Sequence, residues 1–186
     1  NKAMSDELEK KGYTFSSANS INWGRLVPQI VYYFSAYVDA IKAGKISAGD
    51  AINFVVPTGN FGDILAGYYA KLMGLPIDRL LCASNSNNVL TDFINSGVYD
   101  KRRDFYKTIS PSMDILVSSN LERLLYNVSD GDAVRVAEYM QRLNNEGFYQ
   151  VDSDDLKRIQ SEFFGAWVDE LETKEAISRI YSDYHY

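Results

Sequence analysis

The sequence predicts an α/β fold, in which a parallel sheet with flanking helices carries a mostly helical subdomain. Two short apolar runs, residues 51–56 and 80–83, have the composition of buried strands, and a helical pattern lies between them. A strand, a helix and a second strand in this order form a βαβ unit, whose strands pair in parallel. Hydrophobic residues make up 46% and charged residues 24% of the chain, as in a globular domain with a buried core.

A long amphipathic helix is expected before the first strand. Between Trp23 and Ile41 the apolar residues recur every three or four positions, which is the helical period. Gly44 is expected to end this helix. Upstream, residues 1–20 are polar and finish in a serine-rich stretch, residues 16–20, that offers several N-caps.

The predicted βαβ unit has clear boundaries. Asp50 and Pro57 bound the first strand, and Asp63 begins the helical pattern that follows. Gly74 is expected to end that helix, because Pro76 cannot continue it.

Residues 89–186 predict a mostly helical subdomain, and residues 1–88 form the α/β part. Apolar side chains repeat at helical spacing through most of this second half. A linker rich in glycine, serine or proline does not separate the two parts. We expect helices at residues 89–94, 113–126, 130–145, 156–171 and 175–184, with a short extended piece at 148–151.

Charge and cysteine content argue against several classes of protein. A net charge of −6 disfavours binding to nucleic-acid phosphates or to a membrane of anionic lipid, since both need clustered Lys and Arg. The one dense basic cluster, residues 101–103, is expected to be a solvated loop. The single cysteine, Cys82, lies in an apolar run, so we expect a buried thiol and a cytoplasmic location. No apolar stretch reaches the roughly 20 residues that span a bilayer.

The loop at residues 57–62, between the first strand and its helix, is the most informative part of the sequence. A turn with two glycines that leads into a helix presents unpaired backbone N–H groups, and the helix dipole adds positive potential, so the loop predicts an anion site. The glycines are expected to permit close approach and positive φ, and Asn60 can add a side-chain donor. From these residues alone, an ordinary turn with Asp63 as the N-cap is an equal alternative. The spacing fits neither a Walker loop nor a Rossmann fingerprint.

Four segments of the chain, in order, resemble segments of threonine synthases. The segment that contains the loop is VPTGNFGDILAG, residues 56–67. With the other three it spreads the resemblance over residues 13–126, which makes the match specific. Those three are SANSINWGRL at residues 17–26, CASNSNNVLTDF at residues 82–93 and YKTISPSMDI at residues 106–115.

The resemblance implies a fold-type II pyridoxal-phosphate enzyme, with a twisted, mostly parallel sheet flanked by helices. It implies the conversion of O-phospho-L-homoserine and water into L-threonine and phosphate. It also implies that the phosphate of the cofactor is wrapped by Gly59, Asn60, Phe61, Gly62 and Asp63.

The same resemblance implies groups near the substrate and the cofactor ring. Ser20, Asn22 and Arg25 open the long first helix, and Arg25 would bind the substrate phosphate, because a guanidinium can contact phosphate through two N–H groups. A surface arginine in a first helical turn is the alternative for Arg25. Residues 84–88 follow the second strand, where open α/β sheets place ligands, although Asx turns before a helix have the same sequence.

Parts of the family's catalytic machinery are not expected in this chain. The lysine that forms the Schiff base lies upstream of the matched region in the family, and the ten lysines present are expected to be solvated side chains. The partner of the pyridine nitrogen lies downstream. The sole histidine, His185, is close to the end of the chain, so a triad or a zinc metal site has no support.

We therefore expect an internal fragment that is inactive by itself, with both ends being cut edges. Because a cut parallel sheet exposes strand edges and apolar faces, the fragment is expected to associate with itself.

Two other functions are open from the sequence. A threonine-synthase-like phospholyase would keep the fold and the cofactor but eliminate phosphate to give a keto acid. A noncatalytic interaction domain would use the acidic, tyrosine-rich helical half to bind a partner. Product analysis with phosphohomoserine separates the first from the synthase, and the second predicts a folded unit that binds neither phosphate nor pyridoxal phosphate.

Overall fold

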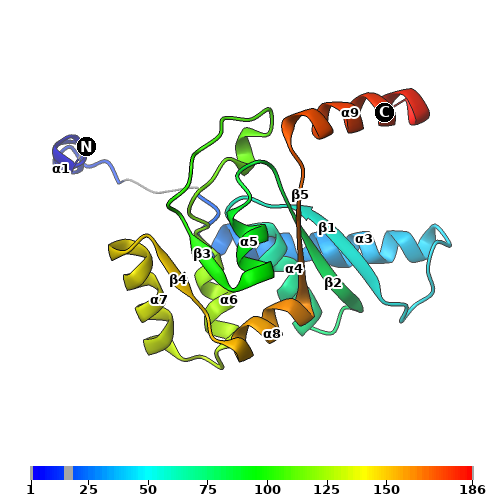
Figure 1. The fold of residues 1–186 in the computed structure, drawn as a ribbon, viewed down its shortest axis with the longest axis horizontal. Coiled ribbons are helices and arrows are strands. Elements are labelled where there is room, and N and C mark those ends of the chain that lie inside the picture. The colour runs from blue at the N-terminus through cyan, green and yellow to red at the C-terminus, as the bar shows by residue number, and fades with distance from the viewer. Residues whose placement is uncertain (1, 15–18, 186) are drawn as a thin grey trace.

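Three parallel strands form the main sheet of the structure, a computed structural model that describes residues 2–14 and 19–185 (Figure 1). A two-stranded antiparallel sheet accompanies it. The possible N-caps at residues 16–18, and residues 17 and 18 of the first family-like segment, lie outside the described residues. The strands are β1 (Ile52–Pro57), β2 (Ile77–Ser84), β3 (Val98–Asp100), β4 (Phe148–Gln150) and β5 (Phe163–Trp167). The helices are α1 (Lys2–Lys10), α2 (Trp23–Leu26), α3 (Ile30–Lys42), α4 (Gly62–Leu72), α5 (Val89–Ser96), α6 (Leu121–Val128), α7 (Ala133–Asn145), α8 (Ser153–Glu162) and α9 (Glu170–Tyr184), with 3-10 turns η1 (Val27–Gln29) and η2 (Pro111–Met113).

The predicted βαβ unit is confirmed. β1 pairs with β2 in parallel, with Val56 opposite Cys82, and α4 connects the two strands. β2 is longer than expected, because it begins at Ile77 and runs through the exposed polar residues Asp78 and Arg79. The α/β class with a parallel sheet and flanking helices is therefore correct.

β5 is the main departure from the sequence prediction. The helix expected at residues 156–171 is wrong beyond Glu162, where α8 ends and a strand begins. β5 pairs in parallel with β2, with Cys82 opposite Gly165. Phe163 and Gly165 are buried while Phe164 is exposed, which is the alternation of a strand. The apolar spacing of three and four residues also fits these positions, so the sequence alone was ambiguous.

The helix expected at residues 113–126 is shorter than predicted. Only η2 and then α6, which begins at Leu121, are helical in this region. The carboxylate of Asp114 accepts hydrogen bonds from the backbone N–H and the hydroxyl of Thr108, at 3.0 and 2.7 Å. These side-chain bonds stabilise an extended backbone at Asp114, with φ −75° and ψ 91°, in competition with a helix.

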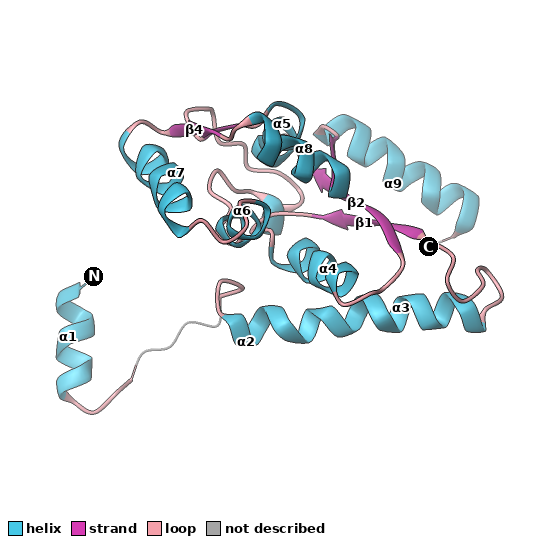
Figure 2. Cartoon of the chain, turned by 90° about the horizontal axis from the view of Figure 1, so that it is seen from below, coloured by secondary structure: helices cyan, strands magenta, loops and turns pink. Residues whose placement is uncertain are grey.

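The long first helix is confirmed with one local change. α2 and α3 follow one another through η1, where Pro28 lacks an N–H group and the helix tightens to a 3-10 turn. α3 ends at Lys42, close to the expected Gly44, whose φ is +65°. Figure 2 shows this long helix beside α4, on which it packs.

One hydrophobic core runs through both halves of the chain. The ring of Phe163 lies 5.5 Å from the ring of Phe61 and 5.7 Å from that of Tyr68, centroid to centroid. Residues on either side of position 88 thus bury the same apolar surface, and the division into two domains there stays a prediction.

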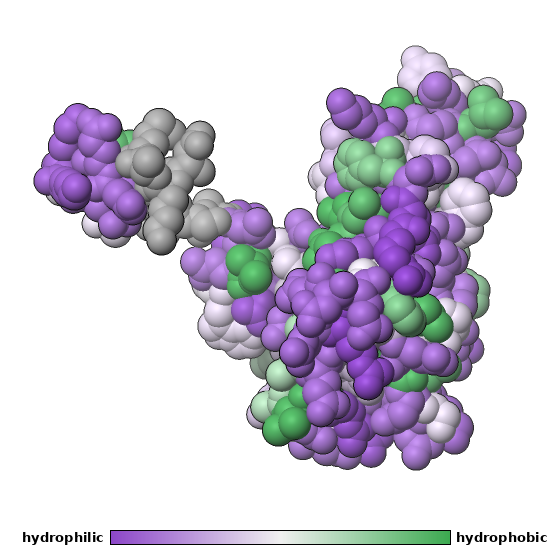
Figure 3. Space-filling model, turned by 60° about the vertical axis from the view of Figure 1, so that its left-hand side comes forward, coloured by the Kyte–Doolittle hydropathy of each residue, from purple (hydrophilic) through white to green (hydrophobic). Residues whose placement is uncertain are grey.

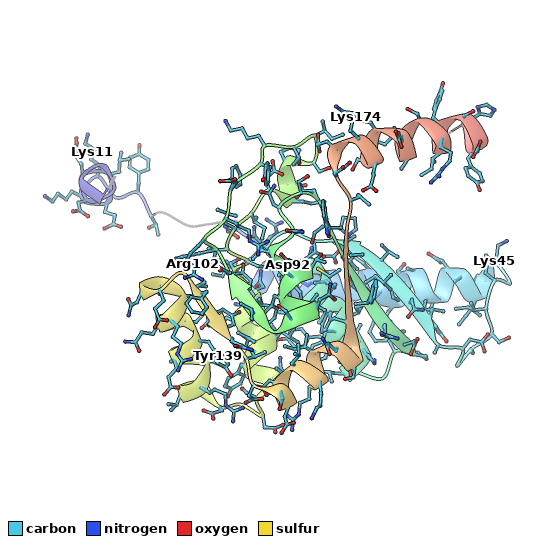
Figure 4. All side chains as sticks on the ribbon, in the orientation of Figure 1. Lys11, Lys45, Asp92, Arg102, Tyr139 and Lys174 are labelled. Carbon is cyan, nitrogen blue, oxygen red and sulfur yellow. The ribbon has the colours of Figure 1, made fainter. Side chains whose placement is uncertain are left out.

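The basic cluster at residues 101–103 is not simply solvated. The Arg102 guanidinium makes two hydrogen bonds to the Asp100 carboxylate, at 2.9 and 2.8 Å, and lies 4.1 Å above the ring of Phe148. Arg103 contacts the Asp92 carboxylate on α5 at 2.8 Å. Figure 4 labels Arg102, which follows β3, and Asp92, which lies on α5. These pairs anchor the loop after β3.

The surface is mainly hydrophilic on the face that Figure 3 draws, where apolar side chains gather in separate patches. Among the helices of the described residues, none combines the length and the apolar character that crossing a membrane requires.

Candidate functional site

A cavity of about 410 Å³ lies where β1 ends and α4 begins. The loop that joins the two elements forms its wall, and we call residues 59–63 the cradle. Side chains and backbone from three other parts of the chain complete the lining. They are Ser20, Gln29, Ser112 and Met113.

The backbone of the cradle turns at Phe61, not at a glycine. Phe61 has φ 60° and ψ 13°, in the left-handed region, and serves as the N-cap residue of α4. Gly59 and Gly62 are not among the described glycines with positive φ. The expectation that the glycines supply a left-handed turn is therefore wrong, and the fully buried Phe61 ring holds the strained residue in place.

Close approach constrains the two cradle glycines to different degrees, Gly59 more than Gly62. A Cβ atom at Gly59 would lie 2.6 Å from the Ser112 carbonyl oxygen, which is shorter than real contacts. A Cβ atom at Gly62 would lie 3.3 Å from Cβ of Ser20. The loop before α2 and the segment around Ser112 thus lie close against the cradle.

The cradle offers a row of N–H donors. Within residues 2–14 and 19–185, no recorded hydrogen bond uses the backbone N–H of Gly59, Asn60 or Phe61. The first N–H groups of α4, from Gly62 onward, have no intrahelical acceptor and carry the positive end of the helix dipole. This arrangement is that of an anion site.

Asp63 is not the N-cap of α4, so the alternative of an ordinary Asp-capped turn is wrong. It stands in the first helical turn, and its backbone oxygen accepts a 2.9 Å hydrogen bond from the Tyr33 hydroxyl. Burial raises the pKa of the Asp63 carboxyl, and the nearby Tyr33 hydroxyl offsets part of that effect. Its Oδ1 atom and the Oε1 atom of Gln29 are buried without a hydrogen-bond partner among the described residues.

Of the three residues expected near the substrate, the structure brings Ser20 to the cradle cavity. Asn22 instead caps α2, where its side-chain oxygen accepts the backbone N–H of Gly24 at 2.9 Å. Arg25 lies in α2, outside the set of residues that line the cavity. The substrate roles of all three stay predictions.

The polar residues after β2 form a clasp instead of lining the cradle cavity. Asn85 makes an Asx turn, accepting the backbone N–H of Asn87 at 2.9 Å. Both amides donate to the Asp114 carboxylate, at 2.8 and 3.1 Å. Burial acts to raise the pKa of Asp114, but these bonds and those from Thr108 outweigh it, and the pKa is lowered. The clasp fixes the segment that contains Ser112.

Two residues that the sequence did not single out contact the cradle. The Ser118 hydroxyl donates to the Gly59 carbonyl oxygen at 3.0 Å, and the Asn120 amide donates to the Asn60 carbonyl oxygen at 2.9 Å. Both lie within the region expected to be helical, and they are 59 and 60 residues from their partners. Neither local spacing nor residue type signals such contacts.

A second, larger cavity of about 550 Å³ lies among α2, α4, α6 and α7. Trp23 and Tyr69 line it, with ring centroids 5.7 Å apart, and Arg123 forms another part of the wall. Its lining includes residues from the first turns of α6 and α7, Glu122 and Ala133, but no glycine, unlike the cradle. Size alone therefore does not identify the functional site, and the cradle is the stronger candidate.

Comparisons with known proteins identify relatives over nearly the whole chain. No family model matches the chain. Threonine synthase-like 1 of Homo sapiens is 48% identical over 172 residues, which are 92% of this chain and 23% of that protein. Threonine synthase of Saccharomyces cerevisiae is 42% identical over 178 residues, which are 91% of this chain and 34% of that protein.

A solved structure extends the similarity to the fold. The structure of pyridoxal-phosphate-bound threonine synthase from Brucella melitensis matches 100% of this chain and 39% of its own, with 44% identity and a TM-score of 0.90. The chain thus spans 23% to 39% of the length of these relatives. With sequence and fold in agreement over nearly all its residues, the chain belongs to the threonine synthase family.

Proposed function

We propose that the chain supplies the phosphate-binding part of a pyridoxal-phosphate-dependent threonine synthase. The complete protein would convert O-phospho-L-homoserine and water into L-threonine and phosphate. One observation carries this proposal: at the N-terminus of α4, the backbone N–H groups of residues 59–61 have no acceptor among the described residues, and a Cβ atom at Gly59 would collide with the backbone of Ser112. Such a row suits the dianionic phosphate of the cofactor.

The cradle residues fit the cofactor's phosphate in shape and in donor chemistry. Gly59, Asn60, Phe61, Gly62 and Asp63 would hold it chiefly through their backbone N–H groups. When bound, pyridoxal phosphate supplies an electron sink for reactions of amino acids. Because Ser20 lines the same cavity, we expect it to contact a ligand there.

Asp63 is the one cradle side chain whose charge opposes an anion. Its raised pKa follows from burial, which disfavours the carboxylate form. In its protonated form the carboxyl would donate a hydrogen bond to phosphate. We assign its backbone N–H to the cradle and expect its side chain to modulate affinity.

The chain alone is proposed to be inactive. None of the residues that line the cradle cavity is a lysine. Figure 4 shows Lys11, Lys45 and Lys174 at the outside of the molecule, on or beside α1, α3 and α9. We therefore propose that the catalytic lysine comes from another part of the complete protein.

A threonine-synthase-like phospholyase is the second candidate, because a relative with 48% identity carries the name threonine synthase-like 1. Such an enzyme would use the same cradle and substrate, and would release a keto acid in place of threonine. The third possibility, a noncatalytic interaction domain, lacks a comparable observation and predicts no response to phosphate.

In the deciding experiment, O-phosphohomoserine and pyridoxal phosphate are added to the complete protein that contains this chain. Product analysis by mass spectrometry should find threonine and phosphate, and omission of pyridoxal phosphate should abolish both. A keto acid as the main product would favour the phospholyase. Absence of any phosphate release by a protein that binds pyridoxal phosphate would overturn both enzymatic proposals.

Two further predictions from the sequence are kept as proposals. We propose a cytoplasmic location, which rests on the single cysteine; burial raises the pKa of the Cys82 thiol to about 12.

We also propose that the chain associates with a second copy of itself. Val55, Leu81 and Phe164 lie in one register row across the sheet, and Val55 and Phe164 are 65% and 47% exposed. A parallel sheet normally has both faces covered.

A further inference from the structure

We propose that Ser118 and Asn120 are positioning residues that aim two N–H groups of the cradle at the bound phosphate. The inference rests on the proposed function, because it assigns a task to residues around the same cavity. It starts from the hydrogen bonds of two consecutive peptide groups in the loop between β1 and α4.

Each of these peptide groups is held by its carbonyl oxygen. The Gly59 oxygen accepts the Ser118 hydroxyl at 3.0 Å. The Asn60 oxygen accepts both the side-chain amide and the backbone N–H of Asn120, at 2.9 and 3.1 Å. All these donors come from the segment that leads into α6.

Because a peptide group is planar, fixing the direction of its C=O bond also fixes the direction of its N–H bond. A trans peptide group is flat, and its C=O and N–H bonds point in opposite directions. The carbonyl of Gly59 shares its peptide group with the N–H of Asn60, and the carbonyl of Asn60 shares its group with the N–H of Phe61. When Ser118 and Asn120 draw the two oxygens away from the cavity, both N–H groups point toward it.

Asn120 is well placed for this task because its own side chain cannot turn. It is fully buried, and its amide also donates to the Ser20 carbonyl oxygen at 3.3 Å. Its side-chain oxygen accepts a hydrogen bond from Arg123, whose other terminal nitrogen donates to the Ile21 carbonyl oxygen at 2.8 Å. Asn120 therefore joins the cradle to the loop before α2, which carries Ser20.

Ser118 is held with similar precision. It is 7% exposed, and its backbone N–H donates to the Tyr99 hydroxyl oxygen at 2.8 Å. The neighbouring Ser119 provides a matched control, because its hydroxyl is buried without a hydrogen-bond partner among the described residues. Asn127 is the corresponding control for Asn120, since it lies on α6 and its amide donates to Arg123 and Tyr69, away from the cradle.

The test is a titration of the full chain, labelled with ¹⁵N, with inorganic phosphate. The backbone resonances of Asn60 and Phe61 report on the two N–H groups. In the wild type both should shift, and the shifts give a dissociation constant. Ser118→Ala should weaken phosphate binding about fivefold and reduce the Asn60 shift most, because one orienting hydrogen bond is lost. Asn120→Leu, of similar shape but without side-chain donors, keeps only the backbone N–H bond to the Asn60 oxygen, and it should weaken binding about tenfold and reduce the Phe61 shift most.

The control variants Ser119→Ala and Asn127→Leu should bind phosphate as the wild type does. If Asn120→Leu fails to fold, Asn120→Asp decides, because its carboxylate keeps the Arg123 contact but cannot donate to the Asn60 oxygen. Wild-type affinity in both Ser118→Ala and the tested Asn120 variant would overturn the inference while leaving the proposed function intact. Absence of any phosphate shift in the wild type would overturn the cradle itself, and the inference with it.

Discussion

Gly59 and Ser112 approach so closely that a single methyl group cannot be placed between them. A Cβ atom at Gly59 would lie 2.6 Å from the Ser112 carbonyl oxygen and 3.3 Å from Cα of Met113. These are backbone contacts, which cannot rotate out of the way as a side chain can. The cradle and the 3-10 turn at residues 111–113 are thus fixed against each other, although they are far apart in the chain.

Gly59→Ala adds only one methyl group, but it should lower both the stability of the chain and its affinity for phosphate. The added methyl group displaces the backbone at Ser112, which also lines the cavity, and we expect a loss of about 1–3 kcal/mol in the free energy of unfolding. Phosphate affinity should fall at least about tenfold. The control is Gly24→Ala, where the nearest atom is 3.3 Å away in the Asn22 side chain. Urea denaturation and phosphate titration measure both variants, and equal behaviour of the two would contradict the close-approach argument.

At Phe61, substitution by glycine should destabilise the fold less than substitution by alanine, which is the reverse of the usual order. Its side chain is fully buried, so Phe61→Ala should lower the free energy of unfolding by about 3–5 kcal/mol. Phe61→Gly loses the same ring but relieves the left-handed backbone, and it should be less destabilised than Phe61→Ala by about 1 kcal/mol.

Phe93 is the matched control for Phe61, because it is equally buried but sits inside the regular helix α5. There glycine should be worse than alanine by about 1 kcal/mol. Urea denaturation of the four variants tests the comparison. The same order of alanine and glycine at both positions would show that Phe61 is not strained.

The sequence anticipated those parts of the fold whose signals are local. Gly74 and Pro76 mark the end of α4, and the apolar period marks α3, so both helices could be predicted. Residues 163–167 could not, since a run of mainly apolar residues fits a helical and a strand period alike. A left-handed Phe61 runs against residue preference, because only the packing of its ring offsets the strain.

The candidate site shows the same division between local and distant signals. The cradle could be proposed from the sequence, because a strand followed by two glycines and a helix is a local pattern, and its residues line one cavity. Their contact with phosphate stays a prediction. Its supports were missed, because Ser118 and Asn120 act on partners some sixty residues away. No residue type announces which distant carbonyl oxygen it will bind.

Tyr99 connects the core of the helical half to the cradle, so removal of its hydroxyl should affect both stability and phosphate binding. It accepts the Ser118 N–H at 2.8 Å and donates to the Leu116 carbonyl oxygen at 3.1 Å. Tyr99→Phe leaves both groups unpaired, and we expect a loss of about 1–3 kcal/mol in the free energy of unfolding. Phosphate binding should also weaken. Tyr149→Phe is the control, because this ring stacks on Tyr99 at 5.4 Å and its hydroxyl makes no recorded hydrogen bond within the described residues. Equal losses in both variants would contradict the role of the Tyr99 hydroxyl.

The open face of the sheet should govern self-association. Val55→Lys places a charge in the exposed row that Leu81 and Phe164 continue, so it should reduce association without lowering stability. Val134→Lys is the control, because Val134 is 71% exposed on α7, away from the sheet. Sedimentation velocity over a range of concentrations measures the effect. A wild-type chain that stays monomeric at every concentration would contradict the prediction.

Asp63 and Asp114 should give pH dependences of opposite sign. The pKa of Asp63 is raised above the ordinary value of 3.8, so the folded state holds this proton more tightly than the unfolded state. Its contribution to stability is present below that ordinary value and is lost as pH rises through the raised pKa. Asp63→Asn should therefore be more stable than the wild type at pH 7, and the difference should vanish in acid. Removal of the charge should also tighten phosphate binding.

The pKa of Asp114 is lowered, so its contribution is present above the ordinary value of 3.8 and is lost as pH falls through the lowered pKa. Asp114→Asn should accordingly be less stable than the wild type at pH 7, because the replacement amide cannot accept the hydrogen bonds of Thr108, Asn85 and Asn87 as the carboxylate does. Urea denaturation from pH 3 to pH 8 compares the two variants under the same conditions. If Asp63→Asn lost stability at pH 7 as Asp114→Asn does, the prediction would be contradicted. The Asp63 carboxylate would then stabilise the folded state as an anion, through a hydrogen-bond donor other than those described above.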